Sequence, residues 1–359
     1  MNNKMKILIL PGDGVGPEIT LEARKVINKI SNIFNLNIEI EEALFGGVAL
    51  DKLDSPYPEE TKIKVKESDA VLLGAVGGIK YDVLPKEKKP ESGLLSLRKE
   101  SNLFINIRPI ISFPELANSS SVKSEYINNL DIVIIRELIS GLYFGEPRGF
   151  NDDSTEAYNT MRYSKSEISR ISDYAFKLAR SRNKKLCSVD KANVLEVSQL
   201  WRSTTNEISK NYKDIELSHL YVDNAAMQLV QNPKQFDVMV TENLFGDILS
   251  DIASVLTGSI GMLPSASLNE FNFGVYEPIH GSAPDIAGMN IVNPIATILS
   301  VAMMFQHTFQ RVDIYNSILD AVKSTLSENK FTKDLTTSDN FISTEDMGNF
   351  IVEKLIGEK

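Results

Sequence analysis

Cysteine is almost absent from this 359-residue chain, in which Cys187 is the only one. No disulfide can form within the chain, which suits a reducing compartment, and we expect a cytoplasmic protein. Cys187 lies in an apolar, strand-like run and is interpreted as a core residue. No run approaches the roughly 18 apolar residues of a membrane helix, and the first apolar run, of about four residues, is too short for a secretory signal. We therefore expect no membrane partner.

An excess of basic residues is also lacking. The chain has 38 Lys and Arg against 48 Asp and Glu, a formal net charge of −10. Proteins that bind nucleic acid through its phosphates carry a basic footprint, so we expect no nucleic-acid partner. Small anionic substrates remain possible, because a local arginine cluster can oppose the global sign. Apolar residues make up 42%, an ordinary globular value, and the length allows two domains.

Short apolar runs alternate with helical patterns along the chain, without an internal repeat. This rhythm predicts an α/β fold with a largely parallel sheet. The glycine-rich stretch 11–18, PGDGVGPE, follows a strand-like run and opens a helical one. It lacks the third-glycine spacing of a dinucleotide fingerprint, so it indicates only a tight turn.

Polar residues stand at the ends of five strand-like runs. They are Arg108, Arg136, Lys191, Asp223 and Asp247. Ligands of open α/β sheets bind beyond the carboxyl ends of strands, so together these residues predict one cleft, although each alone could be a solvated strand end.

Asp247 and Asp251 lie one turn apart in a helical pattern over 243–257. Acidic residues early in a helix can simply complement its dipole or form a solvated face. Alternatively, both carboxylates hold Mg²⁺ or Mn²⁺, which take hard oxygen ligands. Asp223 is a candidate third ligand, or a helix cap.

Arg98, Arg108 and Arg136 suggest a carboxylate clamp, because the guanidinium fork binds carboxylates bidentately; alone, each could be a salt-bridge residue. Lys191 near a cation would have a lowered pKa, suited to a general base. Tyr143 could donate a proton or be a core tyrosine.

The stretch 276–294, YEPIHGSAPDIAGMNIVNP, is dense in Gly, Pro, Ser and Asp. Such a loop offers backbone N–H groups to a polar ligand. Asp285 could accept hydrogen bonds from a ribose diol and would repel a 2′-phosphate. His280 could stabilise the loop or contact a cofactor.

Long motifs in a fixed order give the chain a nearly end-to-end resemblance to a known family. These motifs are GDGVGPE, GLLSLRKE, NIRP, RELISGLYFGEPRG, VDKANVLE, YVDNAAMQLV, NLFGDILSD, GSIGMLPSAS and YEPIHGSAPDIAG. The sequence resembles the isopropylmalate dehydrogenases of the isocitrate/isopropylmalate dehydrogenase family, which are β-decarboxylating enzymes. One departure is Ile139-Ser140, where most relatives are expected to have Thr-Gly.

The resemblance implies two α/β domains around a large mixed sheet that is not a Rossmann fold. The first domain would comprise residues 1–103 and 258–359, and the second 104–257. It also implies a homodimer whose active sites are shared between subunits, and the NAD- and metal-dependent oxidative decarboxylation of 3-isopropylmalate in leucine biosynthesis.

Roles for individual residues are also implied by the resemblance. Lys191, from the partner subunit, would take the hydroxyl proton and Tyr143 would protonate the enol carbon. Asp247 and Asp251 of one subunit and Asp223 of the other would hold Mg²⁺ or Mn²⁺. Arg98, Arg108 and Arg136 would bind the substrate carboxylates. The NAD site would comprise Gly78, Glu91, Glu277, His280, Gly281, Ser282, Ala283, Pro284, Asp285, Ile286, Ala287, Gly288 and Asn293.

Four residues bear on the choice of substrate. Leu94, Leu95 and Val194 would form an apolar pocket for the isopropyl group, and Glu91 beside it would repel the γ-carboxylate of isocitrate. Relatives that act on D-malate, tartrate or isocitrate remain alternatives, as does a non-catalytic carboxylate-binding protein.

Overall fold

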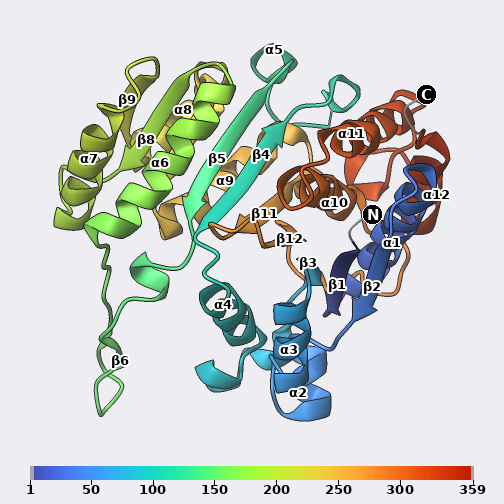
Figure 1. Ribbon diagram of the computed structural model, residues 1–359, viewed down its shortest axis with the longest axis horizontal. Coiled ribbons are helices and arrows are strands. Elements are labelled where there is room, and N and C mark those ends of the chain that lie inside the picture. The colour runs from blue at the N-terminus through green and yellow to red at the C-terminus, as the bar shows by residue number, and fades with distance from the viewer. Residues whose placement is uncertain (1–3, 118, 357–359) are drawn as a thin grey trace. The chain divides into compact units, whose positions relative to one another are not determined.

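The computed structural model describes residues 4–117 and 119–356 of the chain. Its contacts divide the chain into two compact units, each described by itself. Unit 1 comprises Met1–Asn102 and Gly258–Lys359, and unit 2 comprises Leu103–Thr257. Within unit 1, Figure 1 shows helix α1 (Gly16–Ile33, blue) beside helix α12 (Thr344–Lys354, red), so both ends of the chain contribute to one unit.

In the described residues of unit 1, five sheet strands lie in the order β2-β1-β3-β12-β11. The pairs β1–β2, β1–β3 and β3–β12 are parallel, and β11–β12 is antiparallel. Its remaining elements are β1 (Met5–Gly12), β2 (Ile38–Glu42), α2 (Gly47–Leu53), α3 (Glu59–Glu67), β3 (Ala70–Ala75), α4 (Pro90–Glu100), β11 (Pro264–Leu268), β12 (Gly274–Pro278), α10 (Ile295–His307) and α11 (Val312–Ser327).

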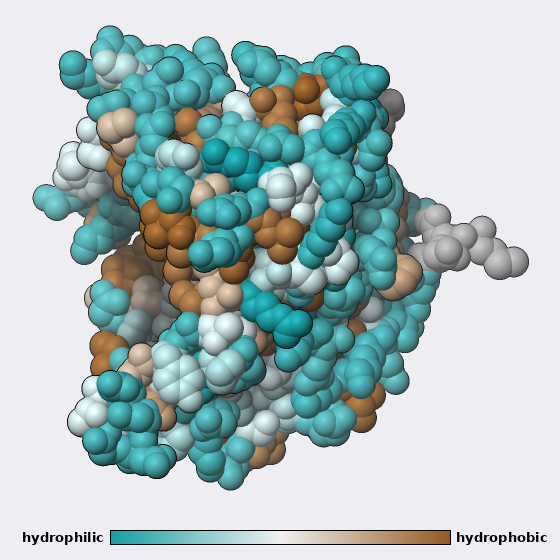
Figure 2. Space-filling view, turned by 90° about the vertical axis from the view of Figure 1, so that its left-hand side faces the viewer, coloured by the Kyte–Doolittle hydropathy of each residue, from teal (hydrophilic) through white to brown (hydrophobic). Residues whose placement is uncertain are grey.

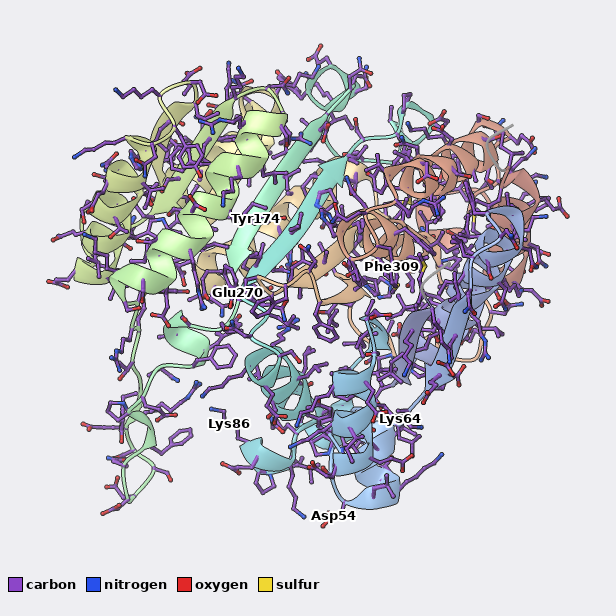
Figure 3. The ribbon with its side chains drawn as sticks, in the orientation of Figure 1. Asp54, Lys64, Lys86, Tyr174, Glu270 and Phe309 are labelled. Carbon is purple, nitrogen blue, oxygen red and sulfur yellow. The ribbon has the colours of Figure 1, made fainter. Side chains whose placement is uncertain are left out.

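Helix α10 forms the centre of the unit 1 core. Every residue from Ile295 to Phe305 is buried, which agrees with its nearly continuous apolar sequence. It packs against α1, α11, β11 and β12. Polar side chains lie at the surface instead, and Figure 3 shows Asp54 and Lys86 projecting away from the ribbon.

The part of unit 2 that the structure describes has five sheet strands in the order β4-β5-β10-β8-β9 and a separate hairpin, β6–β7. The pair β4–β5 is antiparallel, and the other sheet pairs are parallel. Its elements are β4 (Ile105–Ile111), α5 (Ser124–Ile127), β5 (Asp131–Glu137), β6 (Arg148–Phe150), β7 (Ala157–Asn159), α6 (Lys165–Ser181), β8 (Lys185–Asp190), α7 (Glu196–Ser209), β9 (Glu216–Tyr221), α8 (Val222–Gln231), β10 (Val238–Thr241) and α9 (Asn243–Ser254).

The predicted α/β fold with large mixed β-structure is confirmed. The ten sheet strands include parallel and antiparallel pairs, and helices follow most of them along the chain. Unit 1 differs from a Rossmann domain, whose strands are parallel in the order 3-2-1-4-5-6. No helix in the described parts of the chain has both the length and the apolarity to cross a bilayer.

Candidate active site

Helix α9 carries the two aspartates that the sequence singled out. Its N-cap is Glu242, whose side chain accepts hydrogen bonds from the amides of Leu244 (3.0 Å) and Phe245 (2.8 Å). The helix runs to Ser254, and a 3₁₀ turn continues it to Thr257, the predicted end. Asp247 and Asp251 therefore lie one turn apart on one helix face, as the spacing predicts.

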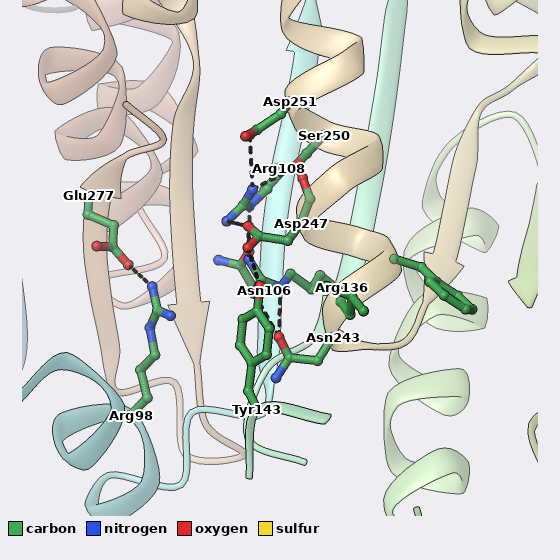
Figure 4. A network of polar contacts seen from close by, with 12 residues as sticks. Arg98, Asn106, Arg108, Arg136, Tyr143, Asn243, Asp247, Ser250, Asp251 and Glu277 are labelled. Atoms are coloured by element: carbon green, nitrogen blue, oxygen red, sulfur yellow. Dashed lines mark hydrogen bonds and ion pairs between the residues drawn. The ribbon is translucent and has the colours of Figure 1, made fainter. Parts of the chain in front are cut away.

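The structure gathers five predicted site residues of unit 2, here called the Asp247 cluster: Arg108, Arg136, Tyr143, Asp247 and Asp251. Figure 4 shows both arginines and the tyrosine converging on the Asp247 carboxylate. Arg136 Nη1 pairs with Asp247 Oδ1, Arg108 Nη2 lies 3.3 Å from the same oxygen, and Tyr143 Oη donates to Oδ2 at 2.8 Å. Asp251 is more remote, 3.9 Å from Arg108 Nη1.

Strand register brings the two arginines together. Both lie inside their strands, not just beyond the strand ends as the sequence suggested. Because β4 and β5 are antiparallel, Arg136 pairs with Asn106, and Arg108 follows two residues later on the same face. Asn106 Oδ1 accepts from Arg108 Nε at 2.8 Å.

Helix α9 lies directly over Arg136. A Cβ on Gly246 would stand 2.6 Å from Arg136 Cγ, so only glycine permits this close approach. Arg136 and Arg108 are consequently almost fully buried, and their charges are balanced by carboxylates and amide oxygens.

Burial sets the protonation of the cluster. Desolvation, reinforced by the Asp247 carboxylate, raises the pKa of Tyr143 to about 12, so the phenol keeps its proton at neutral pH. Desolvation also raises the pKa of Asp251, and the neighbouring charge of Asp247 adds to the shift while Arg108 opposes it. Any cation bound between these carboxylates would remove that repulsion.

Lys191 and Asp223 form a separate pair in unit 2. Lys191 Nζ donates to Asp223 Oδ1 at 2.7 Å, and this hydrogen bond lowers the pKa of Asp223. Asp223 lies in the first turn of α8, where Tyr221 is the N-cap, so Asp223 is not the cap that the sequence left open. Its side chain is 68% exposed. Val194, three residues after Lys191, is exposed as well.

Within the described residues of a single chain, no three His, Cys, Asp or Glu side chains are grouped so that they could hold a metal. Asp247 and Asp251 are thus not joined by Asp223 of the same chain. The third carboxylate that the family resemblance implies would have to come from a second subunit.

In unit 1, Arg98 on α4 donates from Nη2 to Glu277 Oε1 on β12 at 2.8 Å. Both side chains are largely buried. The structure therefore pairs a predicted substrate residue with a predicted cofactor residue. Helix α4 also carries Leu94 and Leu95, both half-buried, and the exposed Glu91 at its first turn. Glu91 lies beside the loop of Gly77 and Gly78, since its Oε1 would be 2.4 Å from a Cβ on Gly77.

The predicted cofactor loop follows β12. Ala283, Ile286 and Ala287 pack against the buried residues Val15 and Val292. Gly281 and Gly288 have open space where a Cβ would stand, whereas Pro284 and Asp285 are exposed. The loop ends at Asn293, whose Oδ1 accepts from the Ile295 amide at 3.0 Å at the start of α10. The carbonyl of Ser282 accepts from the Val15 amide at 2.8 Å.

A cavity of about 510 Å³ lies beside this loop. Its lining includes His280, Gly281, Ala283, Ile286, Asn293 and Asp334. His280 Nδ1 lies 2.9 Å from the Gly281 carbonyl, whereas Nε2 is buried and has no hydrogen-bond partner among the described residues. Burial lowers the pKa of His280, so the ring is neutral at pH 7. Of the two roles that the sequence allowed for His280, the structure shows the contact that stabilises the loop, through Nδ1. Its Nε2 could still bind a ligand.

The glycine-rich stretch 11–18 has a structural role that the sequence analysis did not find. Asp13 is buried, and its carboxylate accepts from the amides of Gly47 (2.8 Å), Val48 (2.7 Å) and Gly77 (2.8 Å). Asp13 thereby holds the loop next to Gly78. The predicted tight turn is present, with Gly12 and Gly14 at positive φ.

Asn243 was missed as well. It is fully buried at the first position of α9 and bonds the guanidinium of Arg136. Asp13 and Asn243 both stand just after an apolar strand, the same signal that identified the other site residues. The sequence did not single out either residue, because a carboxylate in a glycine-rich turn and a neutral amide after a strand are both common in ordinary turns and caps.

Comparison with known proteins places these residues in context. Residues 6–351 match the family model described as isocitrate/isopropylmalate dehydrogenase. A 3-isopropylmalate dehydrogenase of Chromobacterium violaceum is 58% identical over 92% of this chain and 94% of its own. One of Prochlorococcus marinus is 53% identical over 98% of this chain and 99% of its own. The crystal structure of an isocitrate dehydrogenase from Methylococcus capsulatus superposes with a TM-score of 0.88 at 33% identity, covering 98% of this chain and 99% of that one.

Proposed function

The chain belongs to the isocitrate/isopropylmalate dehydrogenase family, and from that premise we propose that it catalyses the oxidative decarboxylation of (2R,3S)-3-isopropylmalate. The products are 4-methyl-2-oxopentanoate and CO₂, in leucine biosynthesis, with NAD as oxidant and Mg²⁺ or Mn²⁺ as cofactor. We place the enzyme in the cytoplasm. Relatives named 3-isopropylmalate dehydrogenase, 53–58% identical over at least 92% of the chain, support this substrate over the alternatives.

The Asp247 cluster is the observation that carries the proposal. It combines two buried arginines with a protonated tyrosine and two carboxylates on one helix face. The guanidinium groups suit the two carboxylates of a malate-type substrate. The aspartates are hard oxygen ligands one helix turn apart, from which both side chains can reach one ion, so the residue types fit the implied metal. Asp223 would be the third ligand, supplied by the partner subunit.

The cofactor loop fits NAD. Since a carbonyl only accepts, His280 Nδ1 must be the donor to Gly281, and Nε2 of the neutral ring is then an acceptor. An adenine amino group is a donor of the required kind, and the mostly apolar cavity lining suits the purine ring. The exposed carboxylate of Asp285 would accept from the ribose hydroxyls and disfavour the 2′-phosphate of NADP.

When bound, the divalent cation would polarise substrate oxygens and NAD would accept the hydride. Lys191 would take the proton of the substrate hydroxyl as the adjacent C–H bond gives up its hydride. Arg108, Arg136 and Arg98 would hold the carboxylates, so that one of them is positioned to leave as CO₂. Tyr143, which retains its proton at neutral pH, would donate it to the enol carbon that remains.

Exposed apolar residues support a homodimer. Met227 and Val230 on α8 are 48% and 45% exposed, and Ile248 on α9 is 49% exposed. Figure 2, drawn from the side on which α7 and β9 lie in Figure 1, shows apolar side chains gathered among polar ones. Helices α8 and α9 pack against each other, so their exposed residues can form one surface for a second copy. Lys191 and Asp223 would then enter the partner's active site.

The test is to measure NADH formation with Mg²⁺ or Mn²⁺ from 3-isopropylmalate, D-malate and isocitrate, using NAD and NADP in parallel. We expect the highest kcat/KM with 3-isopropylmalate and NAD, and no turnover in excess EDTA. A clear preference for D-malate or isocitrate would overturn the substrate. Undiminished turnover in EDTA would overturn the metal requirement, and ligand binding without any NAD affinity would favour a non-catalytic protein.

A further inference from the structure

We propose that Asn243 is a positioning residue, which orients Arg136 toward the substrate and couples this arginine to the turn that carries Tyr143. The proposal rests on the proposed function, because it assigns a purpose to Arg136 and Tyr143 as parts of one active site. It is carried by the hydrogen bonds of a fully buried side chain.

The amide oxygen of Asn243 holds one edge of the Arg136 guanidinium. Oδ1 accepts from Nε at 3.0 Å and from Nη2 at 2.7 Å, as Figure 4 shows. The remaining terminal nitrogen, Nη1, pairs with Asp247. Contacts to two acceptors, Asn243 Oδ1 on one edge and Asp247 on the other, fix the orientation of the guanidinium, which a single acceptor would not do. Arg136 therefore presents one defined face to the cluster.

The amide nitrogen of Asn243 extends the contact to a second segment. Nδ2 donates to the Ser140 carbonyl at 3.1 Å. Ser140 directly precedes the 3₁₀ turn Gly141–Tyr143. Its own amide donates to Glu137 at 3.0 Å, and its hydroxyl donates to Glu167 at 2.6 Å. The turn that bears Tyr143 is thus anchored by three hydrogen bonds of the residue that precedes it.

The backbone of Asn243 is held as well. Its amide donates to Tyr163 Oη at 3.0 Å, and that phenol donates to Glu137 at 3.0 Å. Asn243 cannot rotate without breaking bonds to Arg136 and Ser140 together. Asn243 bonds Arg136 and Ser140 through its side chain and Tyr163 through its backbone, which fixes their mutual geometry, and this is the property that a preorganised site requires.

Loss of this amide has a specific consequence. Arg136 would remain buried and would lose the oxygen that holds its Nε edge, so its guanidinium would shift toward Asp247, the carboxylate with which it already pairs. Arg136 would then be withdrawn from the substrate carboxylate. Binding of isopropylmalate should suffer, whereas NAD, which would bind through unit 1, should not.

The experiment is a double-mutant cycle with Asn243→Ala and Arg136→Lys, measured in the full-length enzyme. We expect Asn243→Ala to lower kcat/KM for 3-isopropylmalate by about 10-fold or more, with KM for NAD changed by less than about twofold. If Asn243 acts through Arg136, the double variant should be no more than about twofold worse than Arg136→Lys alone. Calorimetric binding of 3-isopropylmalate should follow the same pattern.

Ser172→Ala is the matched control. It removes a buried hydrogen bond to Thr205 in the same unit, at 3.1 Å, outside the cluster. It should lower thermal stability without moving either KM. Should Asn243→Ala fail to fold, Asn243→Ser retains a polar side chain that is too short to bind Arg136, and it enters the same cycle.

The possible results separate the two proposals. Additive effects of the two substitutions, or equal changes in both KM values, would overturn the positioning role while the enzyme's activity stands. Absence of 3-isopropylmalate turnover in the unsubstituted enzyme would overturn the proposed function and this inference with it. Non-additive loss confined to 3-isopropylmalate supports both.

Discussion

Two aspartates of unit 2, Asp247 and Asp223, lie in opposite surroundings, one enclosed by its own chain and the other exposed. Asp247 is surrounded by its own chain, with two almost fully buried arginines and a tyrosine as partners. Asp223 has Lys191 as its hydrogen-bond partner and a side chain that is 68% exposed. Both belong to motifs that resemble the same enzyme family, so burial alone does not distinguish functional from surface acids.

The contrast is explained if the chain completes only part of its own active site. The Asp247 cluster would receive substrate within one subunit, whereas the Lys191–Asp223 pair would project into the subunit opposite. An exposed carboxylate paired with the proposed general base is otherwise hard to understand, because bases work where solvent is excluded. The predictions below test that division.

The largest effect is expected at the Lys191–Asp223 pair. Lys191→Ala should lower kcat for 3-isopropylmalate by about 10²- to 10⁴-fold, since the hydroxyl proton loses its acceptor. The matched control is Lys177→Ala, which removes an exposed lysine paired with Asp173 at 2.8 Å in the same unit. Steady-state kinetics of the two variants should differ accordingly. Equal kcat values would show that the Lys191–Asp223 pair is an ordinary surface ion pair.

The two aspartates of α9 should control metal binding. Asp251→Asn and Asp247→Asn should each weaken Mn²⁺ binding by about 10-fold or more, measured by calorimetry. Only Asp247→Asn should also lower the melting temperature, because it leaves two buried arginines with less compensation. An unchanged Mn²⁺ affinity in Asp251→Asn would remove that residue from the metal site.

The surface of α8 should control assembly. Met227→Glu places a charge among the exposed apolar residues and should raise the dimer dissociation constant by about 100-fold or more, with a parallel loss of activity at low protein concentration. Ile63→Glu is the control, since Ile63 on α3 is 50% exposed but lies in unit 1. Sedimentation velocity measures both. A dimer that withstands Met227→Glu would place the interface elsewhere.

The smallest effect is expected at Glu137, a buried carboxylate of unit 2. Burial raises the pKa of Glu137 from 4.5 to about 7, against the opposing hydrogen bonds from Ile139, Tyr163 and Ser140. The stability that protonated Glu137 contributes is full below about pH 4.5 and is lost as pH rises through about 7. In that window the loss is up to about 1.4 kcal/mol per pH unit.

Glu137→Gln cannot ionise, so its melting temperature relative to the unsubstituted protein should rise between pH 5 and 8. Thermal melts across this range, with both proteins in the same buffers, give the difference directly. A difference independent of pH would mean that Glu137 is ionised throughout.

Much of the fold was predictable because its signals are local. The apolar runs became strands, and the spacing of Asp247 and Asp251 placed both on one face of α9. The family resemblance was confirmed by the comparisons. What local patterns could not supply was the antiparallel register of β4 and β5, which places Arg108 and Arg136 inside strands and still on one face.

The supporting residues of the site were harder to predict. Asn243, Asp13 and Ser140 act through hydrogen bonds to residues far away along the chain. Asp13 and Gly47 are 34 residues apart, and Asn243 and Arg136 are 107 residues apart. Contacts between such distant residues produce no periodic pattern in the sequence. Gly246 is similar, because its need for a small side chain exists only where Arg136 passes beneath it. Sequence patterns identify the residues that touch a ligand more readily than those that hold them in place.

The most direct test of the shared active site is complementation between two inactive variants. Asp247→Asn and Lys191→Ala chains are mixed, dissociated and reassembled, and NADH formation from 3-isopropylmalate is measured. A hybrid dimer would contain one site with both residues intact, so random reassembly at equal amounts should restore about a quarter of the unsubstituted activity. Activity that stays at the level of the separate variants, in hybrids shown to have formed, would contradict the account.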